Sequence, residues 1–580
     1  MRDRAIVGVC LAAAVAVAAL AAASDRGAPG AFQHPPLDGP LILTGTFGEY
    51  RPGRFHGGLD YSTGGHVGAP VYAPLDGTIE RVRASGAGYG RSIYLKTSDG
   101  RLIVFGHFDA YDQPFASYVA AAQDSSGQYE QDLWPEPGRF RVRAGQRLGW
   151  SGQSGGVGEP HLHLEVRYGD MAVHPLLVGA SAEDTIAPVI AGIMIEPRTP
   201  VALINGRSAP LRLGSGARPE TVSVSGLVRF EVEAHDPGTR RSDMQPYEIE
   251  LTWANHRLAC RFDSLSWATD MIEGDLVYDR GRLFDAPAHA VLMWAPAGFR
   301  PRAIVTDVPL SEEAGTIPID QSTRPVRVVV IARDFAGHSA QREFVLIFDR
   351  SSPADHASPA LIGPCLAKQG DVGDFNWRIS ADAGFGQGTG CESVSAETLG
   401  VQTAAGDLIP VGNGFHLGPD WLALRKPFEL RARVPDAHPD RQLGLYVRRD
   451  SNWELVGTES DSTRSTWIFH PPHLGRFAFF EDRLAPRIRA LRPPRHAGGA
   501  KPYSKWVLEA RLMEAGSGVD TRACYFVVDR KRRPSEWDGV HQTLRWRPLR
   551  APGHGVHRYV VVATDRAGNA RRASGRFVLD

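Results

Sequence analysis

The sequence predicts a mostly β protein built of several domains. Its 580 residues are too many for one hydrophobic core. The 63 glycines and 42 prolines favour many turns between short strands. The 65 basic residues equal the 65 acidic ones, so nothing in the composition indicates a nucleic-acid partner.

Residues 1–23 have the features of a secretory signal peptide. Arg2 and Arg4 precede an uninterrupted apolar run, which ends in small alanines suited to cleavage. We therefore expect an exported chain, located in the periplasm, the cell envelope or the medium. An uncleaved membrane anchor is the alternative, because the run is nearly long enough to span a bilayer. Residues 24–40 are rich in Gly, Pro and Ala and are predicted to form a linker.

Four cysteines follow the signal segment, and an exported chain meets an oxidising compartment. Cys365 and Cys391 are close in sequence and are the pair expected to form a disulfide. Spacing alone does not establish this pairing.

Residues 41–182 form the first predicted domain, here the N-terminal domain. Alternating apolar residues between turn signals predict five strands in it: Pro70–Ala73, Gly77–Arg83, Ser92–Lys96, Leu102–Gly106 and His161–Val166. Residues 115–134 break this alternation and are predicted to be a helical insertion.

The remainder is predicted to be β-rich and contains two internal repeats. EDTIAPVI at 183–190 recurs as EDRLAPRI at 481–488, and VIARDFAG at 330–337 recurs as VVATDRAG at 561–568. The repeats predict two related modules. Short strands with closely spaced turns favour immunoglobulin-like β-sandwiches for them.

These modules are named A, B and C. Module A (186–350) carries an insertion expected near 240–320, and module C (485–580) is its shorter relative. Module B (355–484) is another β-rich unit. Partner binding, to a glycan or a protein of the cell envelope, and a spacer role are both open for the three modules.

The Asp-x-Ala-Gly sequence ends each of the two repeated modules between apolar strands. Asp and Gly are typical of a β-turn, which explains the pattern without a metal. A calcium loop is the alternative, but one Asp per turn offers too few oxygen ligands.

Histidines and one aspartate in three short segments are candidates for a metal site. His56 and Asp60 are separated by two glycines and a leucine, and the glycines allow both side chains to face one ion. His161 and His163 alternate on a predicted strand and so point to one face, which Glu165 continues. His107 follows another strand. Imidazole and carboxylate are ligands that Zn²⁺ accepts, and a site with three protein ligands keeps a position open for water.

These segments resemble the motifs of a known family. The region resembles the lysostaphin-type, LytM-like zinc metallopeptidases, which cut peptide bonds in bacterial peptidoglycan. The resemblance covers about 140 residues, with the motifs in family order: TGTFGEYRPGRFHGGLDYS (44–62), GAPVYAPLDGTIERV (68–82), GYGRSIYLKTSDGRLIVFGHFD (88–109), VRAGQRLGWSGQSGGVGEPHLHLEVR (142–167) and HPLL (174–177).

The resemblance implies a compact antiparallel β fold with a groove across the metal. By position, His56, Asp60 and His163 resemble the Zn²⁺ ligands, and His107 and His161 resemble the catalytic histidines. A histidine would take the proton of the attacking water, and its partner would stabilise the oxyanion.

Three departures from the family pattern stand near this site. Phe105 stands where Tyr is usual, and Leu164 stands where Phe is common. His174 lies where Asn is usual and is interpreted as structural. The 115–134 insertion follows His107, so we expect either a lid at the groove or a surface elaboration packed away from it.

Two functions remain from the sequence. The first is an exported zinc endopeptidase with a peptidoglycan peptide as its substrate. The alternative is a non-catalytic relative that binds peptidoglycan or regulates hydrolases. All five site positions are filled, which favours the enzyme.

Overall fold

The computed structural model describes residues 30–579 apart from thirteen gaps, at 200, 217–218, 239–242, 280–289, 351–367, 381–393, 402–407, 421, 425, 434–441, 450–451, 458–465 and 493–505. The proposed signal peptide and the proposed Cys365–Cys391 pair lie outside the described residues. Cys260 and Cys524 are buried free thiols. Within the described part, no helix is both long and apolar enough to cross a membrane.

An antiparallel sheet forms the body of the N-terminal domain. Its path, in spatial order, is β1 (Leu43–Gly45), β4 (Leu59–Ser62), β13 (His161–Tyr168), β8 (Leu102–Gly106), β7 (Ser92–Thr97), β6 (Gly77–Ala84) and β10 (Gln131–Leu133). Smaller elements complete the domain: hairpin β2 (Tyr50–Arg51) and β3 (Arg54–Phe55), β11 (Arg141–Val142), and a second sheet of β5 (Pro70–Tyr72), β12 (Arg147–Ser151) and β9 (Phe108–Tyr111).

Strand β13 is central and is buried on both faces. Leu162, Leu164 and Val166 enter the hydrophobic core. Since side chains alternate along a strand, His163 and Glu165 point to the opposite face. Both are buried there as well, so the sheet holds a polar site inside the protein.

Helix α2 (Phe115–Ser126) lies within the insertion. Phe115 and Val119 are its buried residues, and the rings of Phe115 and Tyr118 pack on Phe140. Gly127 ends the helix in the left-handed conformation, which glycine adopts without strain.

Module A contains one large sheet of twelve strands. Its main path is β17 (Leu211–Leu213), β15 (Val189–Pro197), β18 (Glu220–Pro237), β27 (Ser339–Phe348), β26 (Val326–Arg333), β20 (Glu248–Trp253), β21 (His256–Arg261) and β24 (Ile304–Thr306). β16 (Leu203–Ile204), β19 (Asp243–Met244), β23 (Ala290–Leu292) and β25 (Ile317–Ile319) pair with β18.

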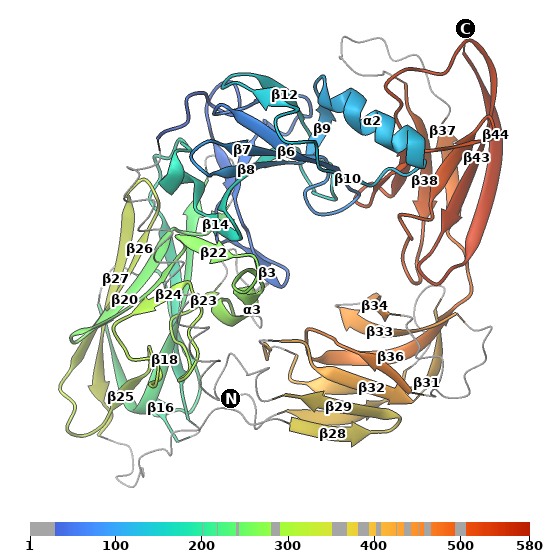
Figure 1. Cartoon of the computed structure of the whole chain (residues 1–580). Coiled ribbons are helices and arrows are strands. Elements are labelled where there is room, and N and C mark those ends of the chain that lie inside the picture. The colour runs from blue at the N-terminus through green and yellow to red at the C-terminus, as the bar shows by residue number, and fades with distance from the viewer. Residues whose placement is uncertain are drawn as a thin grey trace, which may run out of the picture.

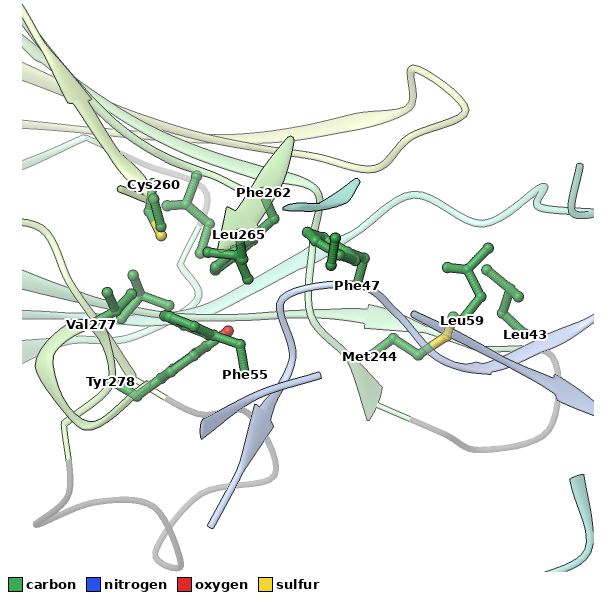
Figure 2. Packing of buried hydrophobic residues seen from close by; sticks show 14 of the residues in the cluster. Leu43, Phe47, Phe55, Leu59, Met244, Cys260, Phe262, Leu265, Val277 and Tyr278 are labelled. Atoms are coloured by element: carbon green, nitrogen blue, oxygen red, sulfur yellow. The ribbon is translucent and has the colours of Figure 1, made fainter. Parts of the chain in front are cut away.

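The N-terminal domain and module A share one hydrophobic core. Figure 2 shows Phe47 and Phe55 of the former among Phe262, Leu265 and Tyr278 of the latter. A Cβ at Gly48 would come within 2.2 Å of the Phe262 ring, so only glycine fits at this contact.

A segment of module A also extends the sheet of the N-terminal domain. β22 (Ser264–Ser266) pairs with β14 (Met171–Val173), which itself pairs with β13. The chain then forms the short helices η2 (Met271–Glu273) and α3 (Gly274–Val277). The insertion in module A thus reaches the strand that carries the candidate site.

Modules B and C each consist of two sheets. Module B pairs β28 (Lys368–Val372), β29 (Phe375–Ile379), β32 (Glu429–Arg433) and β35 (Thr466–Phe469) in one sheet. The other holds β30 (Ser395–Leu399), β31 (Leu408–Gly418), β36 (Gly475–Asp482), β33 (Leu443–Arg449) and β34 (Asn452–Gly457). The immunoglobulin-like topology of the modules stays a prediction.

Module C is the smaller of the two. Its first sheet is β37 (Arg487–Arg492), β38 (Leu508–Met513), β42 (Thr543–Trp546) and β41 (Glu536–Asp538). The second is β40 (Lys531–Arg533), β39 (Tyr525–Val528), β43 (Gly555–Thr564) and β44 (Ala570–Leu579).

The four parts follow one another around a ring (Figure 1). Module B approaches module A where His473 Nδ1 lies 3.4 Å from Asp275 Oδ2. Module C returns to the N-terminal domain, where Arg91 pairs with Glu536 at 2.7 Å. The last module therefore packs against the first domain although the whole chain separates them in sequence.

Candidate metal centre

The strand register brings the predicted site residues together. In the pairing of β13 with β4, His163 lies opposite Asp60, and in the pairing of β13 with β8 it lies opposite Gly106. His107 comes directly after β8, and His56 directly after β3. Three neighbouring segments therefore deliver their polar side chains to one point.

Three of these side chains converge on a single small volume. The distances are 3.0 Å from His56 Nε2 to His163 Nδ1, 3.0 Å from His163 Nδ1 to Asp60 Oδ1, and 3.1 Å from His56 Nε2 to Asp60 Oδ1. Ligand atoms at about 2.1 Å from a tetrahedral ion stand roughly 3.4 Å from one another. The triangle matches one face of such a coordination shell within a few tenths of an ångström.

Glycines 57 and 58 make room for this convergence. A Cβ at Gly58 would lie 2.5 Å from the Leu164 carbonyl oxygen and 2.9 Å from the His163 ring, and one at Gly57 would lie 3.0 Å from Met271. The backbone at Gly57 and Gly58 is not left-handed. These glycines are thus required for space rather than for the backbone curl expected from the sequence.

The charges at the cluster suit a cation. Burial lowers the pKa of His163, but Asp60 and Glu165 outweigh this effect and raise it. Arg51 Nη2 donates to Asp60 Oδ2 at 2.9 Å, which leaves Oδ1 facing the two imidazoles. His56 Nδ1 donates to the Thr46 carbonyl at 2.7 Å, so its Nε2 presents a lone pair. The donor set of two imidazoles and one carboxylate fits Zn²⁺.

His107 and His161 lie beside this cluster with their rings 4.7 Å apart. His107 Nδ1 donates to the Ser154 carbonyl at 2.8 Å, and His161 Nδ1 donates to the Glu159 carbonyl at 2.8 Å. A carbonyl only accepts, so each ring carries its proton on Nδ1 and keeps Nε2 as a base. His161 Nε2 stands 3.4 Å from Asp60 Oδ1, which places it next to the ligand triangle.

The backbone of His107 is left-handed, with φ at 63°. This conformation is uncommon for a residue with a side chain, and such strain often marks a functional position. Its amide donates to the Tyr89 carbonyl at 2.9 Å, which holds the turn after β8.

Glu165 is fully buried beneath His163, with Oε2 3.7 Å from its Nε2. Arg167 Nε, Trp267 Nε1 and the Tyr89 hydroxyl donate to its carboxylate at 2.6, 2.6 and 2.5 Å. Burial raises the pKa of Glu165, but His163 and Arg167 together lower it to about 2. The carboxylate therefore stays ionised and orients the His163 ring.

Several residues of this site escaped the sequence reasoning, among them Arg51 and Trp267, as did Tyr89 and Arg167. Arg51 lies within the quoted 44–62 motif, so a signal for it existed. Trp267 belongs to module A, more than a hundred residues after Glu165 in the chain, and no pattern in the sequence connects the two.

His174 and the insertion contact the later modules. His174 is buried, stacks on Phe335 of module A with centroids 4.8 Å apart, and accepts from the Leu176 amide. After α2, the Tyr129 hydroxyl donates to Glu536 of module C at 3.1 Å. Glu130 pairs there with Arg522. These contacts with module C favour the surface elaboration over the lid.

Curated relatives of the chain include peptidases and a cell division protein. An uncharacterized metalloprotease of Haemophilus influenzae is 33% identical over 131 residues, which are 23% of this chain and 22% of that protein. The DD-carboxypeptidase/endopeptidase Mpg of Neisseria meningitidis is 30% identical over 125 residues, 22% of this chain and 23% of that protein. The cell division protein DipM of Caulobacter vibrioides is 27% identical over 133 residues, 23% and 17% of the two chains. The chain thus spans less than a quarter of these relatives.

The solved structures that resemble the chain include two peptidase domains. The catalytic domain of lysostaphin from Staphylococcus simulans is 26% identical with a TM-score of 0.17, and the match covers 23% of this chain and 86% of that one. The catalytic domain of the M23 protein EnpA from Enterococcus faecalis is 26% identical with a TM-score of 0.18, and covers 24% and 88%. No family model matches the chain.

Proposed function

Since the chain carries a LytM-like metallopeptidase domain, we propose that it is an exported zinc endopeptidase that hydrolyses peptide bonds of bacterial peptidoglycan. The ligand triangle of His56, Asp60 and His163, with sides of 3.0 to 3.1 Å, carries this proposal. It is buried and lies beside two histidines whose Nε2 atoms are not blocked by a carbonyl. A binding protein without catalysis needs no such arrangement of five polar side chains.

The chain's own residues supply the proton transfers of the hydrolysis. When bound, Zn²⁺ acts as a Lewis acid and lowers the pKa of water. His161 Nε2 stands next to the ligand triangle and would accept a proton of the attacking water. It would then deliver this proton to the amide nitrogen as the C–N bond breaks, so that the amine leaves neutral. Burial lowers the pKa of His107 to about 3, so its ring is neutral at rest. It would donate a hydrogen bond to the oxyanion of the peptide carbonyl after Nε2 takes up the second proton of the attacking water. Both rings are held in one orientation by their Nδ1 hydrogen bonds.

The site also has a supporting layer that fixes its geometry. Arg51 holds Asp60 through Oδ2, and Glu165 lies behind His163. Groups that position metal ligands in this way raise metal affinity and activity. The layer includes Trp267 of module A, so the proposed enzyme is active as a multi-domain unit.

The experiment is digestion of purified peptidoglycan by the full chain, with the products identified by mass. We expect cleaved stem peptides or cross-links, loss of cleavage after a chelator strips the metal, and recovery when Zn²⁺ is added back. The His163→Ala variant should lose both the zinc, measured by elemental analysis, and the cleavage.

The matched control is His66→Ala, which removes an exposed histidine of the same domain. It should keep one zinc and full activity. A wild-type protein that holds zinc but releases no peptide product would instead establish the non-catalytic alternative. Full zinc content in His163→Ala would show that the ligands are wrongly assigned.

A further inference from the structure

Module A contains a second group of polar side chains, separate from the proposed zinc ligands. Ligand atoms of Asp184, Asp334 and His338 lie within 4.8 Å of one another. Asp236 lies beside this group, because it lines the same cavity as Asp184 and the turn residues Phe335 and Ala336. Three carboxylates therefore meet from three separate segments: the connection into the module, the end of β18, and the Asp-x-Ala-Gly turn.

Module C repeats this group. Ligand atoms of Asp482, Glu514 and Asp565 also lie within 4.8 Å of one another. Asp482 ends β36, Glu514 follows β38, and Asp565 begins the second Asp-x-Ala-Gly turn. Asn569 occupies the position that His338 has in module A.

The two groups are equivalent in strand register, not only in composition. Ile190 pairs with Ala234 in module A, and Ile488 pairs with Leu512 in module C. In both modules the first acid lies six residues before the isoleucine, and the second acid lies two residues after its partner. Equivalent strand pairing therefore places three acidic side chains near one another in both modules.

One oxygen of the Asp236 carboxyl group has no hydrogen-bond partner, although the residue is buried. Its residue is 4% exposed, and its Oδ1 has no hydrogen bond. Burial, together with the nearby Asp184 and Asp334, raises the pKa of Asp236 to about 8. A buried carboxyl group of this kind is costly unless it is paired or coordinates a metal.

The residue four positions after each turn Asp donates a hydrogen bond to that Asp instead of serving as a metal ligand. His338 Nδ1 donates to Asp334 Oδ2 at 2.8 Å, and Asn569 Nδ2 donates to Asp565 Oδ2 at 2.7 Å. Each carboxylate oxygen has two lone-pair sites, so the braced oxygen retains one for another partner. The donors that both modules share are then oxygens alone.

We propose that each group binds one Ca²⁺, which ties the segment entering the module to the module itself. Hard oxygen donors from carboxylates, completed by carbonyls and water, are the ligands of this ion. A cavity of about 200 Å³ borders Asp184 and Asp236 and provides a path for the ion and its water. Each Asp-x-Ala-Gly turn alone offers too few oxygen ligands for Ca²⁺. The tertiary structure places two further carboxylates from other segments beside each turn.

The positions of the sites indicate their role in the ring. Asp184 lies in the connection from the N-terminal domain to module A, and Asp482 is the last residue of module B's β36. Asn569 Nδ2 also donates to the Asp482 carbonyl at 3.0 Å, so module C already holds this connection. An ion at each point fixes the orientation of successive domains around the ring in Figure 1.

The test uses the full chain, stripped of metals, reloaded with Zn²⁺ and titrated calorimetrically with CaCl₂. We expect two Ca²⁺ per chain with dissociation constants between about 10⁻⁶ and 10⁻³ M. Asp236→Asn should bind one ion, Glu514→Gln should bind one, and the double variant should bind none. Glu312→Gln, which changes an exposed acid of module A, should still bind two.

Thermal unfolding separates a binding defect from a folding defect. Asp236→Asn should melt no lower than wild type without Ca²⁺ and should lack the calcium-induced rise of the melting temperature at this site. The proposal is overturned if wild type binds no Ca²⁺ up to about 10 mM. It is equally overturned if the folded Asp236→Asn and Glu514→Gln variants bind as wild type does.

Discussion

The contact between module C and the N-terminal domain contains a buried carboxylate, Glu536, besides the pair of Arg547 with Asp109. This carboxylate accepts from Arg91 Nη2 at 2.7 Å and from the Tyr129 hydroxyl at 3.1 Å, and Arg547 Nη2 lies 3.4 Å away. Burial raises the pKa of Glu536, but Arg91 and Arg547 outweigh it and lower the pKa to about 2. We predict that Glu536→Ala opens this contact.

The pKa shift of Glu536 gives the free energy that this carboxylate contributes to the contact. A carboxyl group whose pKa is lowered from 4.5 to about 2 on folding contributes about 3 kcal/mol of stability at neutral pH. Because the folded-state pKa is depressed, this contribution is complete above pH 4.5 and is lost as the pH falls towards 2. Removal of the carboxylate leaves Arg91 buried without this ion pair, whereas Arg547 keeps its pair with Asp109 at 2.8 Å. Breaking a buried pair costs about 3–5 kcal/mol.

Hydrogen exchange measures this opening peptide by peptide. A loss of about 3 kcal/mol should accelerate exchange at the contact roughly 100-fold, in peptides covering 128–133 and 533–547. Glu130→Gln is the matched control, since it breaks the neighbouring pair with Arg522, whose side chain is 80% exposed. If Glu536→Ala exchanges no faster than this control in both peptides, the buried carboxylate does not hold the ring closed.

Three further predictions concern the zinc site and its surroundings. His107→Ala and His161→Ala should each keep zinc by elemental analysis but lose about 100-fold or more in the rate of peptide release, and loss of metal in either would mean that ligand and catalyst are wrongly divided. Burial lowers the pKa of His174 from 6.5 to about 3, so its neutral form stabilises the fold above pH 6.5 and this contribution falls on acidification. Between pH 7.5 and 5, wild type should lose about 2 kcal/mol more than His174→Asn in urea unfolding, and equal losses would contradict the shift. Trp267→Phe removes the bond to Glu165 at 2.6 Å and should lower the free energy of unfolding by about 1.5–3 kcal/mol with zinc retained, whereas an unchanged value would show that the bond contributes nothing.

The strands of the N-terminal domain were predictable because their apolar residues alternate between clear turns. The observed β8 has the predicted bounds, Leu102–Gly106, and β13 starts as predicted at His161. The prediction of a mostly β chain with a LytM-like domain is confirmed. Local patterning decides such strands, since a half-buried strand must alternate whatever it pairs with.

The candidate site was predictable for a different reason, namely that its residues stand within short motifs. His161 and His163 share one strand, so their spacing places both on one face, whereas His56 and Asp60 stand together within the 44–62 motif. The function of the glycines was not predictable, because the close approach of Leu164 and His163 to Gly58 depends on strand pairing.

The sequence by itself determined the strand pattern, the five polar positions and the two repeated modules, because each is written in residues near one another in the chain. The tertiary structure alone decided that Trp267 supports Glu165, that Glu536 closes the ring, and that three acids meet in modules A and C. These contacts join residues up to 445 positions apart. Such pairings follow from how sheets pack and cross between domains, and no local periodicity records them.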